Sequence, residues 1–197
     1  MPGCAGFAIA LPVSHPAINS IFSLTNHEVW AVSAHHRGLD NAMIATWIVP
    51  ATLVYDELRL VAVLSVENYT VELLRESGRF AVQMLAEGQH ELLPRLGLHS
   101  GRAKDKLAGL PLARSPGGLA LLEGTCGWAE CVVVNAMDSG DRLVFLADVV
   151  AQGIHPGRKP LHKRDAFERL SPGQALSLVE KALLDAQRDR KLLKRFR

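Results

Sequence analysis

The chain of 197 residues is long enough for one sizeable core, or for one core with an appendage. Hydrophobic residues make up 48% of it and charged residues 21%, a balance that argues against a disordered or fibrous protein. No apolar run approaches the roughly 20 residues that a membrane-spanning helix needs. The apolar opening of the chain has no basic segment before it, so we expect neither a signal peptide nor a membrane location.

Charge is unevenly divided along the chain. Residues 153–197 contain 12 basic and 5 acidic residues, a balance of +7, whereas residues 1–152 contain 10 basic and 15 acidic residues, a balance of −5. This asymmetry predicts a body over 1–152 that carries a basic linker and C-terminal helix over 153–197.

The cysteines and histidines give no sign of a metal site. Cys4, Cys126 and Cys131 are odd in number and lack zinc-like spacing, which favours free thiols in a reducing compartment. His35 and His36 are adjacent, so in a strand they point to opposite faces and cannot bind one ion together. We therefore expect a cytoplasmic protein without a bound metal.

Most of the predicted elements are strands. Between residues 11 and 150 the sequence alternates loosely or is rich in β-branched residues, with turn-forming residues between the runs. Hairpin turns are predicted over 35–41 and 137–141. The predicted strands cover residues 20–26, 28–36, 41–54, 58–66, 80–85, 126–137 and 141–153.

Two short helices interrupt these strands. The helix over 68–78 has Thr70 as its expected N-cap and Gly78 as its stop, and a second helix over 87–97 is limited by Pro94. Six or more strands with two short helices predict a mainly β fold with helical inserts. A small barrel fits this pattern better than a parallel α/β sheet.

A longer helix is predicted near the C-terminus. Ser171 as N-cap and Pro172 at the first helical position are strong start signals. Positions 188–197 hold six basic residues and one acidic residue. The apolar residues at helical spacing are Leu176, Val179, Leu183 and Ala186.

This basic helix has several interpretations. It can pack on the barrel or on a second copy of the chain, or it can dock an acidic partner or nucleic acid. The absence of an aromatic platform argues against single-stranded nucleic acid, and the absence of Trp on the apolar face argues against a membrane surface.

Three short motifs carry candidate chemistry. The loop GRAKDKLAGL at 101–110 is a solvated loop or an anion-binding loop, because it combines a flexible glycine with three basic residues. The helix start NYT at 68–70 suits a phosphate, although most such starts are ordinary caps. SGDR at 139–142 predicts a hairpin turn in the first instance. There is no nucleophile elbow, P-loop or dinucleotide fingerprint.

The order of these blocks is more informative than any one of them. GLDNAMIATWIVP at 38–50 is followed by LVAVLSVENYTVELLRESGRFAVQMLAEGQHELL, SGRAKDKLAGLPL and LLEGTCGWAECVVVNAMDSGDRLVFLADV. This series resembles the flavin reductase-like family of FMN-binding split barrels, which includes flavoredoxin-like proteins and NAD(P)H:flavin oxidoreductases. The resemblance covers about residues 10–152 and implies a split β-barrel.

The family resemblance also implies a cofactor, a reaction and a set of site residues. It implies FMN, with FAD as the alternative, bound at a homodimer interface and reduced by NAD(P)H without a catalytic side chain. Main-chain groups and Thr46 would donate to the flavin, with Met43 or Trp47 as its walls. Arg142 is expected near the nicotinamide nucleotide. The expected cofactor-binding residues are Asn41, Ala42, Met43, Ile44, Ala45, Thr46, Trp47, Asn68, Tyr69, Thr70, Arg102, Lys104 and Lys106.

The sequence departs from the family pattern at three places. Ile44 and Thr46 stand where the family has Thr and Ser, Arg142 stands where it has His, and VYDELRL replaces a proline-rich turn. The leading hypothesis is an NAD(P)H-dependent flavin reductase that supplies a monooxygenase or another acceptor. A non-catalytic flavin-binding electron carrier, or a partner-binding module that uses the basic helix, stays open.

Overall fold

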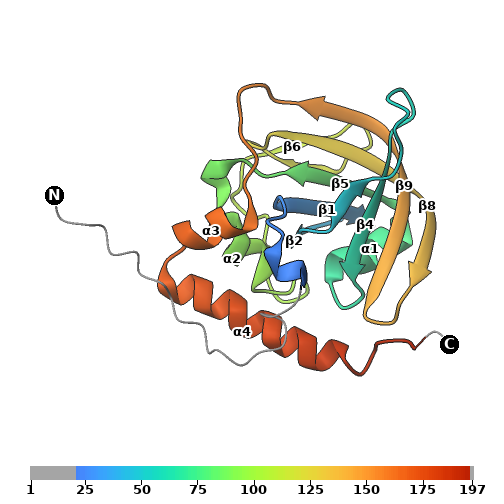
Figure 1. The fold of residues 1–197 in the computed structure, drawn as a ribbon. Coiled ribbons are helices and arrows are strands. Elements are labelled where there is room, and N and C mark those ends of the chain that lie inside the picture. The colour runs from blue at the N-terminus through green and yellow to red at the C-terminus, as the bar shows by residue number, and fades with distance from the viewer. Residues whose placement is uncertain (1–20, 196–197) are drawn as a thin grey trace.

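The computed structural model describes residues 21–195, and its centre is one curled antiparallel sheet of seven strands (Figure 1). Neighbouring strands follow the order β2-β1-β5-β8-β9-β4-β3, so the two strands at the sheet edges, β2 and β3, are consecutive in the chain. The strands are β1 (Trp30–His36), β2 (Leu39–Ala45), β3 (Ile48–Pro50), β4 (Arg59–Ser65), β5 (Arg79–Met84), β8 (Gly127–Asp138) and β9 (Arg142–Ile154).

Short elements surround this sheet. A two-stranded sheet is formed by β6 (Leu112–Arg114) and β7 (Ala120–Leu122). The helices are α1 (Tyr69–Ser77), α2 (Leu92–Gly97), α3 (Lys163–Arg169) and α4 (Pro172–Asp189), with 3₁₀ turns at Ile21–Leu24 and Glu87–Gln89. The expectation of a mainly β fold with helical inserts is confirmed.

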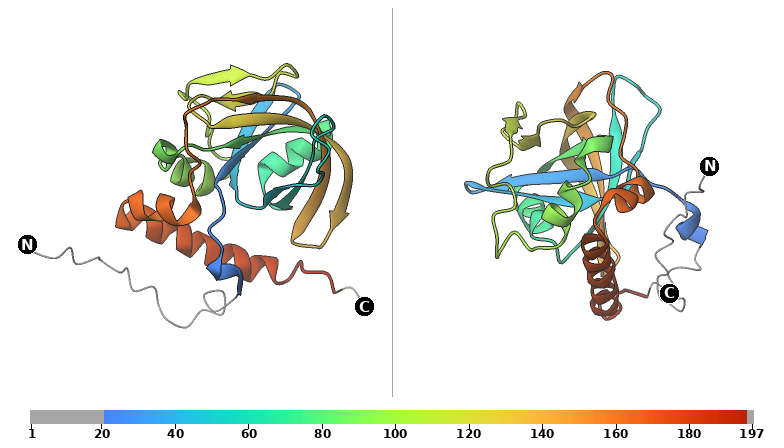
Figure 2. Two further views of the ribbon diagram at one scale, coloured as in Figure 1. Left: turned by 45° about the horizontal axis from the view of Figure 1, so that its top comes forward. Right: turned by 90° about the vertical axis from the view of Figure 1, so that its left-hand side faces the viewer.

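The hollow of the curled sheet holds the larger hydrophobic core. Helix α1 lies in this hollow and packs against β1, β2 and β5 (Figure 2). Its buried residues Val71, Leu73 and Leu74 join inward-facing strand residues such as Phe80 and Phe145. One side of α1 is therefore buried by the barrel itself.

A second core lies on the other face of the sheet. There Ala31 and Ala42 of the sheet contact α2, β7 and the C-terminal helices. Leu161 is fully buried, and an isolated bridge joins Ala86 to Pro160, so the residues after 153 are packed on the body. Within residues 21–195 no helix is long and apolar enough to cross a membrane.

Three local predictions were wrong. Residues 20–26 were expected to form a strand, but Ile21–Leu24 form a 3₁₀ turn, and the Thr25 hydroxyl donates to the Phe22 carbonyl. The N-cap of α1 is Asn68 and not Thr70, because Thr70 is buried one residue inside the helix. Pro94 does not limit α2 but lies within its first half, where a missing N–H costs little.

Other helix ends behave as expected. Gly78 ends α1 with a φ of 67°, the left-handed conformation that favours glycine, and its N–H donates to the Leu74 carbonyl. The Ser171 hydroxyl accepts from the Gln174 N–H at the start of α4. The expected inward face of α4 is only partly correct, because Leu176 is 53% exposed while Ala175 and Leu178 make the contact.

Candidate functional site

Three segments that are distant in sequence meet at Asn41. The Asn41 amide nitrogen in β2 donates to the Thr70 hydroxyl in the first turn of α1 at 2.9 Å, and both side chains are buried. Gly101 lies against the same amide, since a Cβ at this position would be 2.3 Å from Asn41 Oδ1. Only glycine fits there without movement. The junction thus joins the sequence blocks at 38–50, 68–70 and 101–110.

The hairpin that carries Asn41 is firmly held. Arg37 and Gly38 both have positive φ, which is the geometry of a tight two-residue turn between β1 and β2. Asp40 accepts two hydrogen bonds from Arg114, at 2.9 and 2.6 Å, and one from His35 at 2.9 Å. Burial acts to raise the pKa of Asp40, but these bonds outweigh it and hold the pKa below its ordinary value.

The start of α1 has features that suit an anion. Its N-cap, Asn68, makes no side-chain capping hydrogen bond, so the positive end of the helix dipole is not neutralised by a capping side chain. The Arg102 guanidinium lies 5.1 Å from the centroid of the Tyr69 ring and pairs with Glu72. Asn68 and Tyr69 are half-buried and Arg102 is exposed. A phosphate at this end would meet main-chain N–H groups and a guanidinium.

The two lysines of the same loop lie in different surroundings. Lys104 is exposed, whereas Lys106 is 5% exposed and its ammonium donates to the Leu96 carbonyl at 3.0 Å. Burial, with a smaller effect of Lys181, lowers the pKa of Lys106 to about 8. The Lys106 ammonium is therefore held at the end of α2 and not at the start of α1.

The run from Asn41 to Trp47 divides between core and surface. Met43 and Ala45 belong to the core in the hollow of the sheet, and Ala42 is buried in the second core, with Ile44 half-buried against it. Met43 is thus a core side chain and not an exposed wall. Ala45 is the last residue paired with β1, so the half-buried Thr46 lies in the gap before β3, and Trp47 is 49% exposed.

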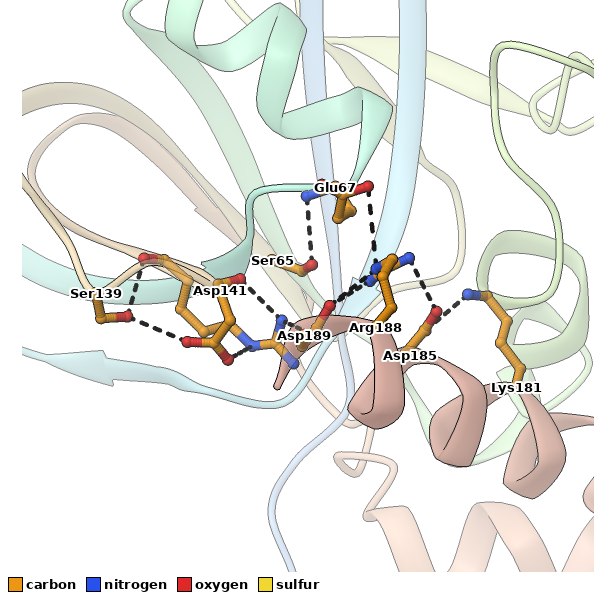
Figure 3. Close-up of polar contacts among 9 residues, drawn as sticks. Ser65, Glu67, Ser139, Asp141, Lys181, Asp185, Arg188 and Asp189 are labelled. Carbon is orange, nitrogen blue, oxygen red and sulfur yellow. Dashed lines mark hydrogen bonds and ion pairs between the residues drawn. The ribbon is translucent and has the colours of Figure 1, made fainter. Parts of the chain in front are cut away.

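Arg142 begins β9 and faces the exposed indole of Trp47. Its guanidinium carbon lies 5.9 Å from the centroid of that ring. Arg142 also donates to the Asp141 carbonyl at 3.1 Å and to the Asp189 carboxylate at 2.8 Å. Asp189 is the last residue of α4, and Figure 3 shows it among the polar contacts of this region. Sequence reasoning missed Asp189; its only signal was one acid within a basic tail.

A separate cavity lies elsewhere in the barrel. It has a volume of about 600 Å³ at one end of the sheet and is lined by Trp30, Trp128 and residues 48–50, which directly follow Trp47. None of the sequence-predicted site residues lines it. In the described part of the chain, no group of three or more His, Cys, Asp or Glu side chains could hold a metal ion.

Comparison with known proteins identifies the family. The model of the flavin reductase like domain matches residues 22–171. The flavin-dependent monooxygenase reductase subunit HsaB of Mycobacterium tuberculosis is 32% identical over 87 residues, which cover 44% of this chain and 45% of that protein. The chain thus spans less than half the length of this relative.

Solved structures share the fold. Nitrilotriacetate monooxygenase component B from Mycobacterium thermoresistibile matches with a TM-score of 0.64 and 24% identity, over 72% of this chain and 78% of that one. The NADH:FAD oxidoreductase SgcE6 of Streptomyces globisporus matches with a TM-score of 0.66 and 19% identity, over 72% and 83%. The family match includes every segment that meets at Asn41, together with Trp47 and Arg142. The protein belongs to the flavin reductase like domain family.

Proposed function

We propose that the protein is an NAD(P)H-dependent flavin reductase that binds FMN, with FAD as the alternative, and passes reduced flavin or electrons to an acceptor. The observation that carries this proposal is the junction at Asn41. It brings the uncapped start of α1 and the Arg102 loop together beside β2. Family membership supplies the expectation that such a junction serves a flavin.

The residues present fit a flavin phosphate and ring. The main-chain N–H groups at Tyr69 and Thr70, with Arg102, would hold the phosphate. Asn41 and Thr70 would support this segment from inside, because their side chains bond to each other and are buried. The half-exposed Trp47 and the backbone at Thr46 would line the ring.

The electron donor NAD(P)H would bind where Arg142 faces Trp47. A bound flavin would supply the hydride-accepting chemistry, so the chain needs only to orient the nicotinamide and exclude water. Arg142 in place of the family histidine places the positive charge of a guanidinium there. This charge suits a nucleotide phosphate.

Partners follow from the relatives and from the surface. Because HsaB is a monooxygenase reductase subunit, we propose a monooxygenase as the acceptor of reduced flavin. Leu53 and Tyr55 in the loop after β3 are each 87% exposed, and large exposed apolar side chains support contact with a second copy or a partner. A homodimer in the cytoplasm is the proposed working form.

The test is an absorbance spectrum of the purified protein, followed by an assay of NADH and NADPH oxidation with added FMN or FAD. The proposal expects bound or readily added flavin and flavin-dependent oxidation. A protein that binds neither flavin and oxidises neither nucleotide would overturn it. Tight flavin binding without nucleotide oxidation would instead identify an electron carrier.

A further inference from the structure

Asp189 is a buried carboxylate at the end of α4. It is 5% exposed, although most positions around it in the last turns of the helix are exposed. One oxygen accepts from Arg142 Nη1 at 2.8 Å, and the other accepts from Arg188 Nε and Nη2 at 2.9 and 2.7 Å. A carboxylate is stable away from water only with such charged donors. Figure 3 shows that Asp189 and Arg188 reach the barrel from the same turn of α4.

This carboxylate holds the Arg142 guanidinium against Trp47. The hydrogen bonds from Arg142 to Asp189 and to the Asp141 carbonyl both use Nη1. The guanidinium carbon stays within 6 Å of the indole centroid, the range of a favourable cation–π contact. Arg142 Nε also lies 3.8 Å from the Asp141 carboxylate, whereas within residues 21–195 Nη2 makes no hydrogen bond, so Nη2 is the donor left for an anion.

The end of α4 is held in place by other contacts around the same site. Arg188 lies 3.9 Å from Glu67, the residue before the N-cap of α1. The Lys194 N–H donates to the Ser139 carbonyl at 2.9 Å. A Cβ on Gly140 would lie 1.9 Å from the Leu192 carbonyl oxygen, so the chain after α4 lies directly on the turn between β8 and β9. These contacts place Asp189 beside the start of α1, which belongs to the proposed flavin site, and beside the turn between β8 and β9, where the nicotinamide nucleotide would bind.

We infer that Asp189 is a positioning residue for the nicotinamide nucleotide, acting through Arg142. The inference rests on the proposed function. An unrestrained arginine side chain loses conformational freedom when it binds a phosphate, and this loss weakens binding. Asp189 removes that cost beforehand by fixing the guanidinium on Trp47. Helix α4, which lies wholly beyond the matched family domain, is then part of the proposed nicotinamide nucleotide site.

The experiment compares D189A, R142A and the double variant with the wild-type protein. We expect D189A and R142A each to raise KM for NAD(P)H roughly tenfold, with kcat and the Kd of FMN nearly unchanged. The KM of the double variant for NAD(P)H should be no higher than that of R142A alone, since Asp189 acts only through Arg142. D189N keeps an oxygen that can accept from Arg142, so its KM for NAD(P)H should lie between those of the wild-type protein and D189A.

A matched control and a second readout keep the test decisive. K181A removes a partly exposed ion pair to Asp185 two turns earlier on α4 and should leave KM unchanged. Acrylamide quenching of the Trp47 fluorescence, taken as the difference from W47F, should rise in D189A and R142A alike. This readout needs no turnover, so it tests the positioning even if the wild-type protein oxidises neither nucleotide.

Two results would overturn the inference. One is a folded D189A protein with unchanged KM and unchanged Trp47 quenching while R142A changes both. The other is a double variant whose KM is the product of two independent losses. Either would leave the proposed flavin reductase function standing. An inactive wild-type protein with no bound flavin would overturn that function and the nucleotide role of Asp189 with it, whereas the Trp47 quenching would still report whether Asp189 holds Arg142 in place.

Discussion

The Asn41 amide donates a hydrogen bond to the Thr70 hydroxyl at 2.9 Å, and neither side chain is exposed to solvent. This bond ties an edge strand of the sheet to the first turn of the helix in its hollow. It therefore fixes the start of α1 relative to β2, which are the two elements on which the proposed flavin site depends.

Replacing Thr70 with Val should weaken both the fold and flavin binding. The change leaves the buried Asn41 amide without its acceptor, which costs about 1–3 kcal/mol of the free energy of unfolding. N41A should cost a similar amount. Because both variants break one bond, the double variant should lose less than the two single losses added together. Urea unfolding and FMN titration measure the two effects, and strictly additive losses would contradict a direct bond.

Arg102 should contribute to flavin affinity through its charge. R102A removes the guanidinium beside Tyr69 at the start of α1, so we expect FMN to bind several-fold more weakly, and the difference should shrink in high salt. R75A removes the same charge from the last turn of the same helix and serves as the control. Equal effects of the two variants would mean that only the net charge of the protein matters.

Gly101 should not tolerate a side chain. In G101A the new Cβ would lie 2.3 Å from Asn41 Oδ1, so either the loop or the buried amide must move. We expect a lower unfolding midpoint and weaker FMN binding. In the control G88A the new Cβ has no atom within 4 Å. Thermal unfolding of both variants with and without FMN distinguishes the two sites, and a wild-type-like G101A would refute the close contact.

Lys106 should make stability depend on alkaline pH. Its pKa is lowered by burial to about 8 in the folded protein, against 10.5 in the unfolded chain. Between these values the unfolded chain binds a proton that the folded protein does not, so stability rises with pH across this window. Below about pH 8 the buried ammonium is charged and costs stability.

The variant K106M removes that buried charge. At pH 7 it should be more stable than the wild-type protein by about 1–2 kcal/mol, after allowing for the Leu96 carbonyl that loses its donor. The rise in stability above pH 8 should also flatten. K104M, at an exposed position in the same loop, should change neither the stability at pH 7 nor the rise in stability above pH 8. Urea unfolding from pH 7 to 10 measures this, and a destabilised K106M at pH 7 would refute it.

Local patterns missed β6, β7 and α3, and they predicted one strand over 41–54 where β2 and β3 are separate. They predicted the other strands of the large sheet and some helix ends, because alternation and turn residues act over a few positions. Gly78 and Ser171 illustrate this, since each ends or begins a helix by contacts within four residues. The order of the sequence blocks predicted the family, although no single block was decisive. The strand expected over residues 20–26 failed, because three large apolar side chains there stay exposed in a 3₁₀ turn.

Side-chain positions in the site could not be predicted in the same way. Lys104 and Lys106 are two residues apart in one loop, yet the carbonyl of Leu96 and the packing around it bury only the second. Thr70 looked like a cap because its partner Asn41 is distant in sequence. Asp189 lies in a basic tail whose inward face contains charges as well as apolar residues, so a hydrophobic pattern could not reveal it.

The last turns of α4 have a different physical character from its first turns. Ala175 and Leu178 hold the beginning of the helix by apolar contact, whereas Arg188, Asp189 and Lys194 hold its end by charge. Apolar contact is little affected by dissolved ions, but partly exposed ion pairs are screened by them. The exposed pair of Lys194 with Asp138 will therefore weaken at high ionic strength, whereas the buried carboxylate of Asp189 will keep its pair with Arg142 and hold the end of α4 on the barrel.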